Sequence, residues 1–306
     1  MLRRSLIPAL ALSLAALVSG CAGPAGGGLT AIGIESQYAD VISQIAGPYA
    51  RVRAIETNPN TDPHEFEASP SVARAIASAS LVVENGLGYD PWAGRILAAA
   101  PNARREVINV QRLLGLPATA NPHVWYNPRT MPAVASAVAA ALSSLRPAQA
   151  DYFQANVRKF DASLEPWRQA LAAFRRRYAG TPVAVTEPVA DELLEAAGCT
   201  ILTPHSLQIA IMNGLDPAPQ DVAAEEALLR EHRVKVLVYN RQVTNPLTTS
   251  FLELARRSGI PVVGVYETLP AGYHYQSWMQ AELAALEHAV SRGASTETLG
   301  PGAGHP

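Results

Sequence analysis

The feature that most constrains the fold of this chain is a long apolar stripe in its middle. Its residues lie alternately four and three positions apart, the spacing of one face of an α-helix. The stripe consists of Phe153, Val157, Phe160, Leu164, Trp167, Leu171, Phe174 and Tyr178. We therefore predict one continuous helix over residues 147–179, with Pro147 at its start and Gly180 directly after its end. Such a helix spans roughly 45 Å, so its stripe must be covered either by two lobes of the same chain or by a second chain in a coiled coil.

Short apolar segments alternate with helical patterns on both sides of this helix, which is typical of parallel sheets covered by helices. We expect strands at 30–36, 52–55, 81–83, 107–110, 183–185, 200–202, 236–239 and 262–265. We expect helices at 38–45, 69–79, 92–100, 131–145, 189–197, 221–231, 247–257 and 277–292. The predicted fold is α/β: two (βα)4-like lobes with parallel sheets, over 30–146 and 180–293, joined by one long rigid backbone helix. The Gly-, Ser-, Thr- and Pro-rich residues 294–306 predict a disordered tail.

Residues 1–20 have the pattern of an export signal. A basic pair, Arg3 and Arg4, precedes an apolar stretch that is short for a membrane-spanning helix, and small residues come before Cys21. Ser19, Gly20 and Cys21 resemble a bacterial lipobox, in which the cysteine becomes the lipidated N-terminus. The other interpretation is an ordinary cysteine near a signal-peptidase site. Residues 21–29 then form a Gly-rich tether, and we expect a protein held by lipid on the outer side of the cell membrane.

The charge of the chain excludes one class of partner. The 24 basic side chains are balanced by 26 acidic ones, the formal net charge is −2, and there is no long basic run. Nucleic-acid binding depends on concentrated positive charge. We therefore expect no nucleic-acid partner.

Polar side chains stand where several predicted strands end. In parallel α/β sheets, ligands bind beyond the carboxyl ends of the strands. Each lobe contributes two such segments: 62–67 (DPHEFE), 121–125 (NPHVW), 186–188 (TEP) and 266–268 (YET). Imidazole and carboxylate groups are ligands for first-row divalent metals, so these segments predict a metal site between the lobes.

The two histidine segments carry a resemblance to a known family. DPHEFE followed by Ser69-Pro70, and then NPHVW about sixty residues on, is similar to the paired histidine motifs of the metal-binding solute-binding proteins of ABC transporters, the zinc and manganese receptor type. The resemblance covers nearly the whole chain beyond the signal. The paired motifs in this order, with a long central helix, are fairly specific, whereas either motif alone is a weak signal.

The resemblance implies one metal ligand from each of four places. Carried onto this sequence, they are His64, His123, Glu187 and Glu267. The third position is Glu where His also occurs in the family, and the fourth is Glu where Asp is common. No histidine lies between His64 and His123, so the His-rich loop of many zinc-specific relatives is absent.

The ligand types bear on the choice of metal. Two imidazoles and two carboxylates give a formally neutral site around a divalent cation. Carboxylates that chelate through both oxygens raise the coordination number, which favours Mn²⁺ or Fe²⁺, whereas inherent affinity favours Zn²⁺ over Mn²⁺. We expect Mn²⁺ or Fe²⁺ ahead of Zn²⁺, as transported ligand rather than cofactor.

Each candidate also has a simpler interpretation. Glu187 precedes Pro188 and has the place of a first-turn helix residue, and Glu267 has that of a solvated loop carboxylate. His205, expected in a loop, and His274 are spare candidates that could instead lie at the surface.

The function that the resemblance implies is capture of a divalent metal ion and its delivery to the permease and ATPase of an ABC importer. We expect a monomer that is not an enzyme and that closes only slightly around its ligand. Two alternatives stay open: an extracytoplasmic metalloenzyme, for which no His-Glu-x-x-His motif is present, and an adhesin-type surface lipoprotein.

Overall fold

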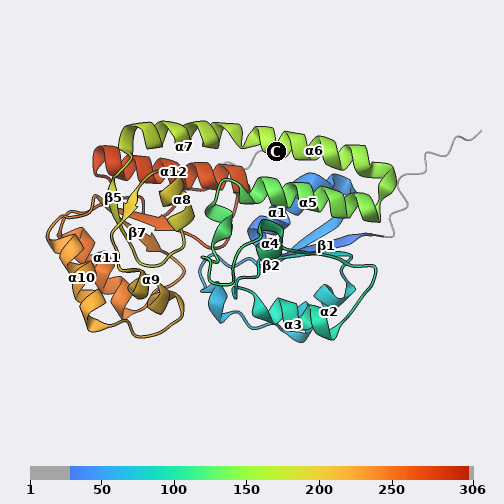
Figure 1. The fold of residues 1–306 in the computed structure, drawn as a ribbon, viewed down its shortest axis with the longest axis horizontal. Coiled ribbons are helices and arrows are strands. Elements are labelled where there is room, and N and C mark those ends of the chain that lie inside the picture. Colours follow the sequence, from blue (N-terminus) through green and yellow to red (C-terminus); the bar gives the residue numbers. More distant parts are fainter. Residues whose placement is uncertain (1–27, 303–306) are drawn as a thin grey trace, which may run out of the picture.

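The computed structural model describes residues 28–302 as two α/β lobes bridged by helices along one side (Figure 1). The proposed signal peptide (1–20), Cys21 and the tether up to residue 27 lie outside the described residues. Leu29 was expected in the tether, but it is buried in the core, so that prediction is wrong at its last residue. Within residues 28–302, every helix is too short or too polar to cross a membrane.

The N-terminal lobe contains a four-stranded parallel sheet in the order β2-β1-β3-β4. The strands are β1 Thr30–Glu35, β2 Arg51–Glu56, β3 Leu81–Glu84 and β4 Glu106–Asn109. The helices are α1 Ser36–Ala46, α2 Pro70–Ser78, α3 Pro91–Ala99, α4 Val110–Leu114 and α5 Thr130–Leu145. Helices α1 and α5 cover one face of the sheet, and α2 and α3 cover the other (Figure 1).

The C-terminal lobe repeats this plan with a parallel sheet in the order β6-β5-β7-β8. The strands are β5 Pro182–Val185, β6 Thr200–Ile201, β7 Val236–Asn240 and β8 Val262–Val265. The helices are α8 Asp191–Ala196, α9 His205–Met212, α10 Pro219–Arg230, α11 Pro246–Arg257 and α12 Tyr275–Arg292. The predicted α/β class with two parallel sheets is confirmed.

The sequence signals for helix ends explain why most predicted boundaries agree with the structure. The Ser69 hydroxyl accepts a hydrogen bond from the Val72 amide, and Pro70 is the first residue of α2. Gly180 follows α7 with a φ of 81°, a conformation that other residues rarely adopt. Two short helices, α4 and α9, were not predicted. His205, expected in a loop, is the first residue of α9.

The predicted linking helix is two helices, α6 Ala150–Ser163 and α7 Glu165–Tyr178, which meet at Leu164. Pro166 has no N–H to donate back to the preceding turn, so the helical hydrogen-bond ladder is interrupted there. The first residues, Pro147–Gln149, form a separate 3₁₀ turn. The prediction of one continuous helix over 147–179 is therefore wrong at these two points, although α6 and α7 run on in nearly the same direction (Figure 1).

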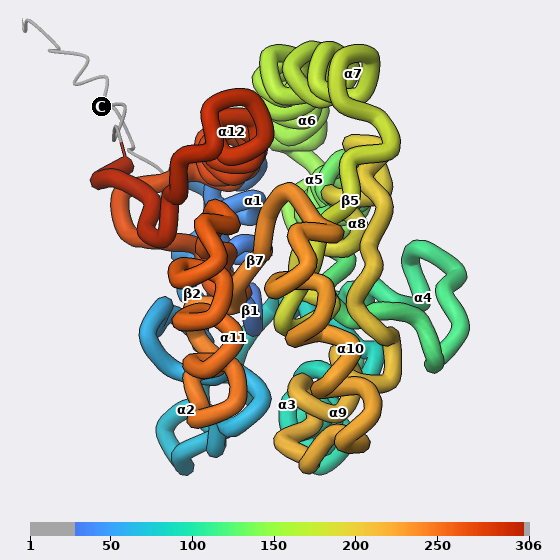
Figure 2. The backbone as a smooth tube through the Cα atoms, turned by 90° about the vertical axis from the view of Figure 1, so that its left-hand side faces the viewer, coloured from blue at the N-terminus to red at the C-terminus, as the bar shows by residue number. Residues whose placement is uncertain are grey.

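The apolar stripe is covered by helices of the same chain. Helix α6 packs on α1 and α5, and α7 packs on α12. Figure 2, seen from the C-terminal lobe, shows α12 beside α6 and α7 above the strands of both sheets. The coiled-coil alternative is therefore not needed to bury the stripe.

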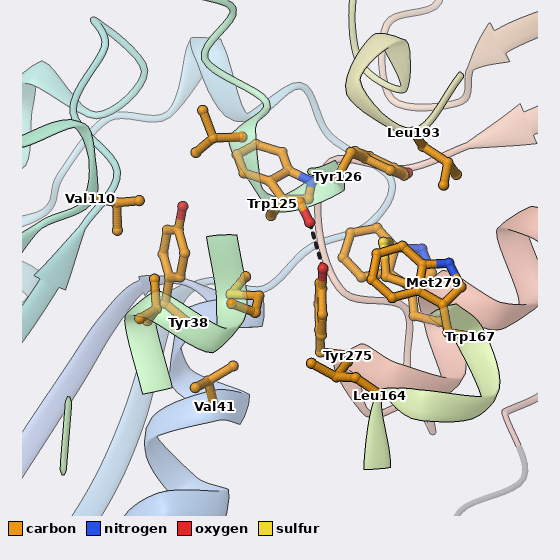
Figure 3. Close-up of a cluster of buried hydrophobic side chains, with 14 of the residues drawn as sticks. Tyr38, Val41, Val110, Trp125, Tyr126, Leu164, Trp167, Leu193, Tyr275 and Met279 are labelled. Carbon is orange, nitrogen blue, oxygen red and sulfur yellow. Dashed lines mark hydrogen bonds between the residues drawn. The ribbon is translucent and has the colours of Figure 1, made fainter. Parts of the chain in front are cut away.

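An apolar core crosses the boundary between the lobes (Figure 3). Trp125 belongs to a 3₁₀ turn of the N-terminal lobe, η3 Val124–Tyr126, while Trp167 comes from α7 and Tyr275 and Met279 from α12. All four side chains are buried, and the Tyr275 hydroxyl donates a 2.7 Å hydrogen bond to the Trp125 carbonyl. The lobes are therefore packed against each other over a shared core.

The end of the described chain is not disordered. Thr296 pairs with Val263 in a parallel bridge, and the Gly264 amide donates to the Thr296 carbonyl at 2.9 Å. The expected disorder of residues 294–306 is therefore wrong for 294–302, and residues 303–306 lie outside the described part.

Candidate metal centre

His64 is positioned by a short 3₁₀ turn, η2 Pro63–Glu65, in the loop that follows β2. The Asp62 carboxylate caps this turn by accepting a 2.8 Å hydrogen bond from the His64 amide, and Pro63 restricts the backbone. The turn directs the imidazole towards the C-terminal lobe. His64 Nε2 lies 3.4 Å from Glu267 Oε2.

His123 follows β4 and α4 and directly precedes η3. The Asn121 Oδ1 atom accepts hydrogen bonds from the His123 amide (3.0 Å) and from ring Nδ1 (2.8 Å). Because an amide oxygen cannot donate, Nδ1 carries the proton. The lone pair of Nε2 then points away from Asn121 and can bind a metal, an arrangement that metal-binding histidines commonly have. His123 Nε2 lies 3.1 Å from Glu267 Oε2.

Glu267 stands two positions past the end of β8 and is 1% exposed. Its Oε2 accepts a 2.9 Å hydrogen bond from the Tyr89 hydroxyl, and its Oε1 accepts a 2.7 Å bond from Asn240 Nδ2. Its carbonyl accepts from Gln37 Nε2 at 3.2 Å. Both lobes therefore hold this carboxylate, and the interpretation of Glu267 as a solvated loop residue is wrong.

Glu187 lies two positions past β5 and is 3% exposed. Its Oε2 accepts a 3.3 Å hydrogen bond from Asn240 Nδ2, the same amide nitrogen that binds Glu267, and its Oε1 is buried without a hydrogen-bond partner. Helix α8 begins only at Asp191, so Glu187 is not a first-turn helix residue.

Three of the four predicted ligands meet at one point. One ligand atom each from His64, His123 and Glu267 lies within 4.8 Å of the others. Glu187 is outside this three-residue cluster and is connected to it through the shared Asn240. Two imidazole nitrogens and a carboxylate in this arrangement can bind a first-row divalent cation.

The charges in the centre affect one another's ionisation. Burial raises the pKa of Glu267, but the adjacent His123 and His64 imidazoles, with Nε2 atoms 3.1 and 3.4 Å from Oε2, outweigh it and hold this pKa well below its ordinary value. Burial lowers the pKa of His123. Burial also lowers the pKa of His64, but the Glu267 carboxylate 3.4 Å away prevails and raises it. Burial and the charge of Glu267 raise the pKa of Glu187 well above its ordinary value. The centre therefore stabilises positive charge beside Glu267.

Several groups around the centre were not predicted as functional. Tyr89 and Asn240 bind Glu267, and Asn121 fixes His123. The end of β7 could have indicated Asn240 and the NPH motif Asn121, whereas Tyr89, five positions past β3, has no such signal. Glu35 and Glu56, paired across β1 and β2, and Asp90 are buried nearby. Burial raises the pKa of Glu56 to about 9 and that of Asp90 to about 6.

The two spare histidines lie outside the cluster. His205 is exposed at the start of α9. His274 caps α12, and its Nδ1 lies 2.7 Å from Asp40 Oδ1. Trp125 packs beside the centre, with its ring 5.4 Å from that of His123.

Comparison with known proteins gives a family match over most of the chain. Residues 35–289 match the family described as ZnuA, zinc-uptake complex component A, periplasmic. The manganese-binding lipoprotein MntA of Bacillus subtilis is 26% identical over 137 residues, which is 42% of this chain and 44% of MntA. The zinc-binding protein TroA of Treponema pallidum is 27% identical over 161 residues, 48% of this chain and 51% of TroA. These alignments span about half the length of the relatives.

The fold also matches solved structures. The solute-binding protein FpvC of Pseudomonas aeruginosa, solved with Mn²⁺, superposes with a TM-score of 0.71 at 22% identity, covering 87% of this chain and all of FpvC. This likeness concerns the two-lobed fold.

Proposed function

This chain belongs to the ZnuA family of metal-binding solute receptors, and on that premise we propose that it captures a divalent transition-metal ion for an ABC importer. Members of this family are receptors for metal transport and not enzymes. The ion is cargo, received outside the cytoplasm and passed to a permease driven by an ATPase. The metalloenzyme and adhesin alternatives are not favoured.

The observation that carries this proposal is the meeting of His64, His123 and Glu267 at one point. The two histidines come from the N-terminal lobe and the glutamate from the C-terminal lobe. A cation bound to all three connects the lobes directly. Its charge also compensates the buried Glu267 carboxylate, which otherwise depends on neutral donors and on the two imidazoles.

Glu187 is the proposed fourth ligand. Its unpartnered Oε1 is buried, and its other oxygen shares Asn240 Nδ2 with Glu267. Burial and then repulsion from Glu267 raise the pKa of Glu187, and a divalent ion beside Glu267 relieves the repulsion. With Glu187 as the fourth ligand, the site is neutral, with two imidazoles and two carboxylates around the divalent ion.

Two carboxylates favour Mn²⁺ or Fe²⁺ over Zn²⁺, because each can bind through both oxygens and raise the coordination number. The relatives include one protein named for manganese binding and one named for zinc binding. We therefore propose Mn²⁺ or Fe²⁺ as the preferred cargo and Zn²⁺ as its strongest competitor.

The proposed cellular setting follows from the N-terminus. Signal cleavage before Cys21 and acylation of this cysteine anchor a monomer to the outer face of the cell membrane. The Gly-rich tether then leaves the receptor free to meet the permease. Because the core of Figure 3 limits lobe movement, release requires the permease to displace ligand-bearing loops rather than open the lobes widely.

Metal titration of the stripped protein tests this function. Calorimetry with Mn²⁺, anaerobic Fe²⁺ and Zn²⁺ should give one ion per chain, and competition between the metals should rank them. His64→Ala and Glu267→Ala should each lower the affinity at least about 100-fold, because each removes a ligand. His288→Ala, at a half-buried position of α12 outside the three-residue cluster, is the matched control and should bind as the unaltered chain does. Absence of saturable binding, or full affinity in both ligand variants, would refute the proposal.

A further inference from the structure

A groove between the two lobes leads to the candidate metal centre. It encloses about 390 Å³. One wall, from the N-terminal lobe, includes Gly88, Ala118 and Asn121, and the other, from the C-terminal lobe, includes Asp191, Glu195 and His205. His64 also lines it. We call this hollow the access groove. At about 30 Å³ per water molecule, it has room for roughly a dozen waters, more than the first hydration shell of a divalent ion needs.

The access groove reaches the metal centre through His64. The His64 side chain is 19% exposed, whereas the side chains of His123 and Glu267 are 0% exposed. A second hollow of about 420 Å³, beside Thr57, Glu65 and Glu67, also lies near the loop of His64. Of the described residues that line this second hollow, none belongs to the three-residue cluster. Of the two hollows, the access groove is therefore the one lined by a residue of the three-residue cluster, His64, whose Nε2 atom lies buried behind the exposed part of the ring.

The wall of the access groove carries unbalanced negative charge. Asp191, Glu192 and Glu195 of α8 all line it, and the described lining contains neither lysine nor arginine. Asp191 Oδ1 is buried without a hydrogen-bond partner. Burial and the charges of Glu195 and Glu192 raise the pKa of Asp191 to about 7. The three carboxylates therefore repel one another, and a passing cation reduces that repulsion.

We propose that the access groove is the path by which the metal ion reaches and leaves the centre, and that Asp191 and Glu195 steer it inward. This inference rests on the proposed function. The ion is drawn by the charge on α8, passes along the groove with most of its water, and meets His64 first. His123 and Glu267 then replace further waters. Charge on the wall of a narrow cleft raises association rates by focusing the field, and salt weakens this effect.

A steric substitution tests the path. Binding of Zn²⁺ can be followed by stopped-flow tryptophan fluorescence, because Trp125 packs on His123. Ala118→Trp narrows the access groove without changing a ligand. It should slow both association and dissociation at least about threefold and leave Kd within about twofold, because a path affects rates and not the equilibrium. Thr57→Trp, which places the same bulk in the second hollow, should leave both rates unchanged.

A charge substitution tests the steering. Glu195→Gln should lower the association rate constant about two- to fivefold at low ionic strength, and the difference should shrink at high salt. Adding Asp191→Asn should slow association further. Glu67→Gln removes the same charge from an exposed glutamate of the second hollow and should have little effect.

The outcomes separate this inference from the proposed function. Unchanged rates in Ala118→Trp with slowing in Thr57→Trp would place the path in the second hollow and overturn the inference while metal binding stands. If Glu195→Gln and Glu67→Gln slowed association equally, the effect would come from the overall charge of the protein. That result would overturn the claim that Asp191 and Glu195 steer the ion. Calorimetry without any saturable binding would instead defeat the proposed function itself. If circular dichroism shows that Ala118→Trp does not fold, Ala118→Leu replaces it in the test of the path. The comparison of Glu195→Gln with Glu67→Gln still tests the steering.

Discussion

The Nε2 atom of His123 lies 3.1 Å from Oε2 of Glu267, although 144 residues separate them in the chain. One belongs to the N-terminal lobe and the other follows the last strand of the C-terminal lobe. With Nδ1 protonated by its bond to Asn121, Nε2 faces the carboxylate with a lone pair unless a proton or a metal ion lies between them. This pair and His64 make the lobe boundary a place where positive charge is stabilised.

Acidification should weaken metal binding. Protons compete with the metal for Nε2 of both histidines. The raised pKa of His64 means that this competition begins at a higher pH than for an ordinary histidine, so affinity is full above that pKa and falls as the pH decreases through it. Between pH 8 and pH 5 we expect Kd to rise at least about tenfold, with one to two protons released per ion. Calorimetry in buffers of different ionisation enthalpy measures both quantities. Equal affinity at pH 7 and pH 5 would rule out histidine ligation.

Asn121→Ala should weaken metal binding without removing a ligand. The substitution takes away the acceptor for His123 Nδ1 and also a 2.6 Å hydrogen bond from Asn121 Nδ2 to the Pro188 carbonyl in the other lobe. Loss of a hydrogen bond that orients a ligating histidine typically lowers metal affinity about 10- to 100-fold. Asn127→Ala, which breaks bonds to the Glu192 side chain and the Arg129 amide but none to a proposed ligand, is the control. Equal Kd values in the two variants would show that Asn121 does not orient the imidazole.

Trp167→Ala should affect both stability and metal affinity. Trp167 is 1% exposed in the core shared by the lobes, so its removal should lower the free energy of unfolding by about 3–5 kcal/mol. Because this core sets how the lobes meet, the affinity for metal should also fall, about tenfold. Phe251→Ala removes a buried ring from the core within the C-terminal lobe and should lower stability only. Urea unfolding and calorimetry of the two variants give the comparison, and unchanged affinity in Trp167→Ala would contradict the role of this core.

Glu225→Gln should remove a pH dependence of folding. Burial raises the pKa of Glu225, on α10, from 4.5 to about 8. Between these values the folded chain retains a proton that the unfolded chain has released, so stability falls as the pH rises across this window. Glutamine cannot ionise. Relative to the unaltered chain, the free energy of unfolding of the variant should therefore rise by up to about 4 kcal/mol at pH 8.5 and by little at pH 4. Unfolding curves at both pH values test this, with the exposed Glu253→Gln as control, and a constant difference between them would contradict it.

Much of the fold could be predicted because its signals are local. Apolar periods, Ser69 before Pro70, and glycines after helices locate most strands and helices within a residue or two. The break at Leu164 could not be predicted from the stripe, because the apolar spacing continues through it and only Pro166 indicates the interruption. The order of residues 294–302 depends on pairing with β8, a contact that composition does not reveal.

The site was predictable to a similar degree. His64, His123 and Glu267 were proposed as ligands because strand ends and paired histidine motifs mark them, and the structure brings them together. Glu187 was proposed with them, but it lies outside the three-residue cluster and is connected to Glu267 through the Asn240 amide that both carboxylates share. The roles of Tyr89 and Asn240 arise from contacts between distant segments, which no local pattern encodes.

The central claim is that one cation binds His64, His123 and Glu267 together. Anomalous diffraction from crystals loaded with Mn²⁺ or Zn²⁺, recorded on both sides of the metal absorption edge, tests it most directly. The account predicts one strong peak at the lobe boundary, about 2.0–2.3 Å from both Nε2 atoms and a Glu267 oxygen. A peak elsewhere on the chain, or none at this position in crystals soaked well above Kd, would contradict it.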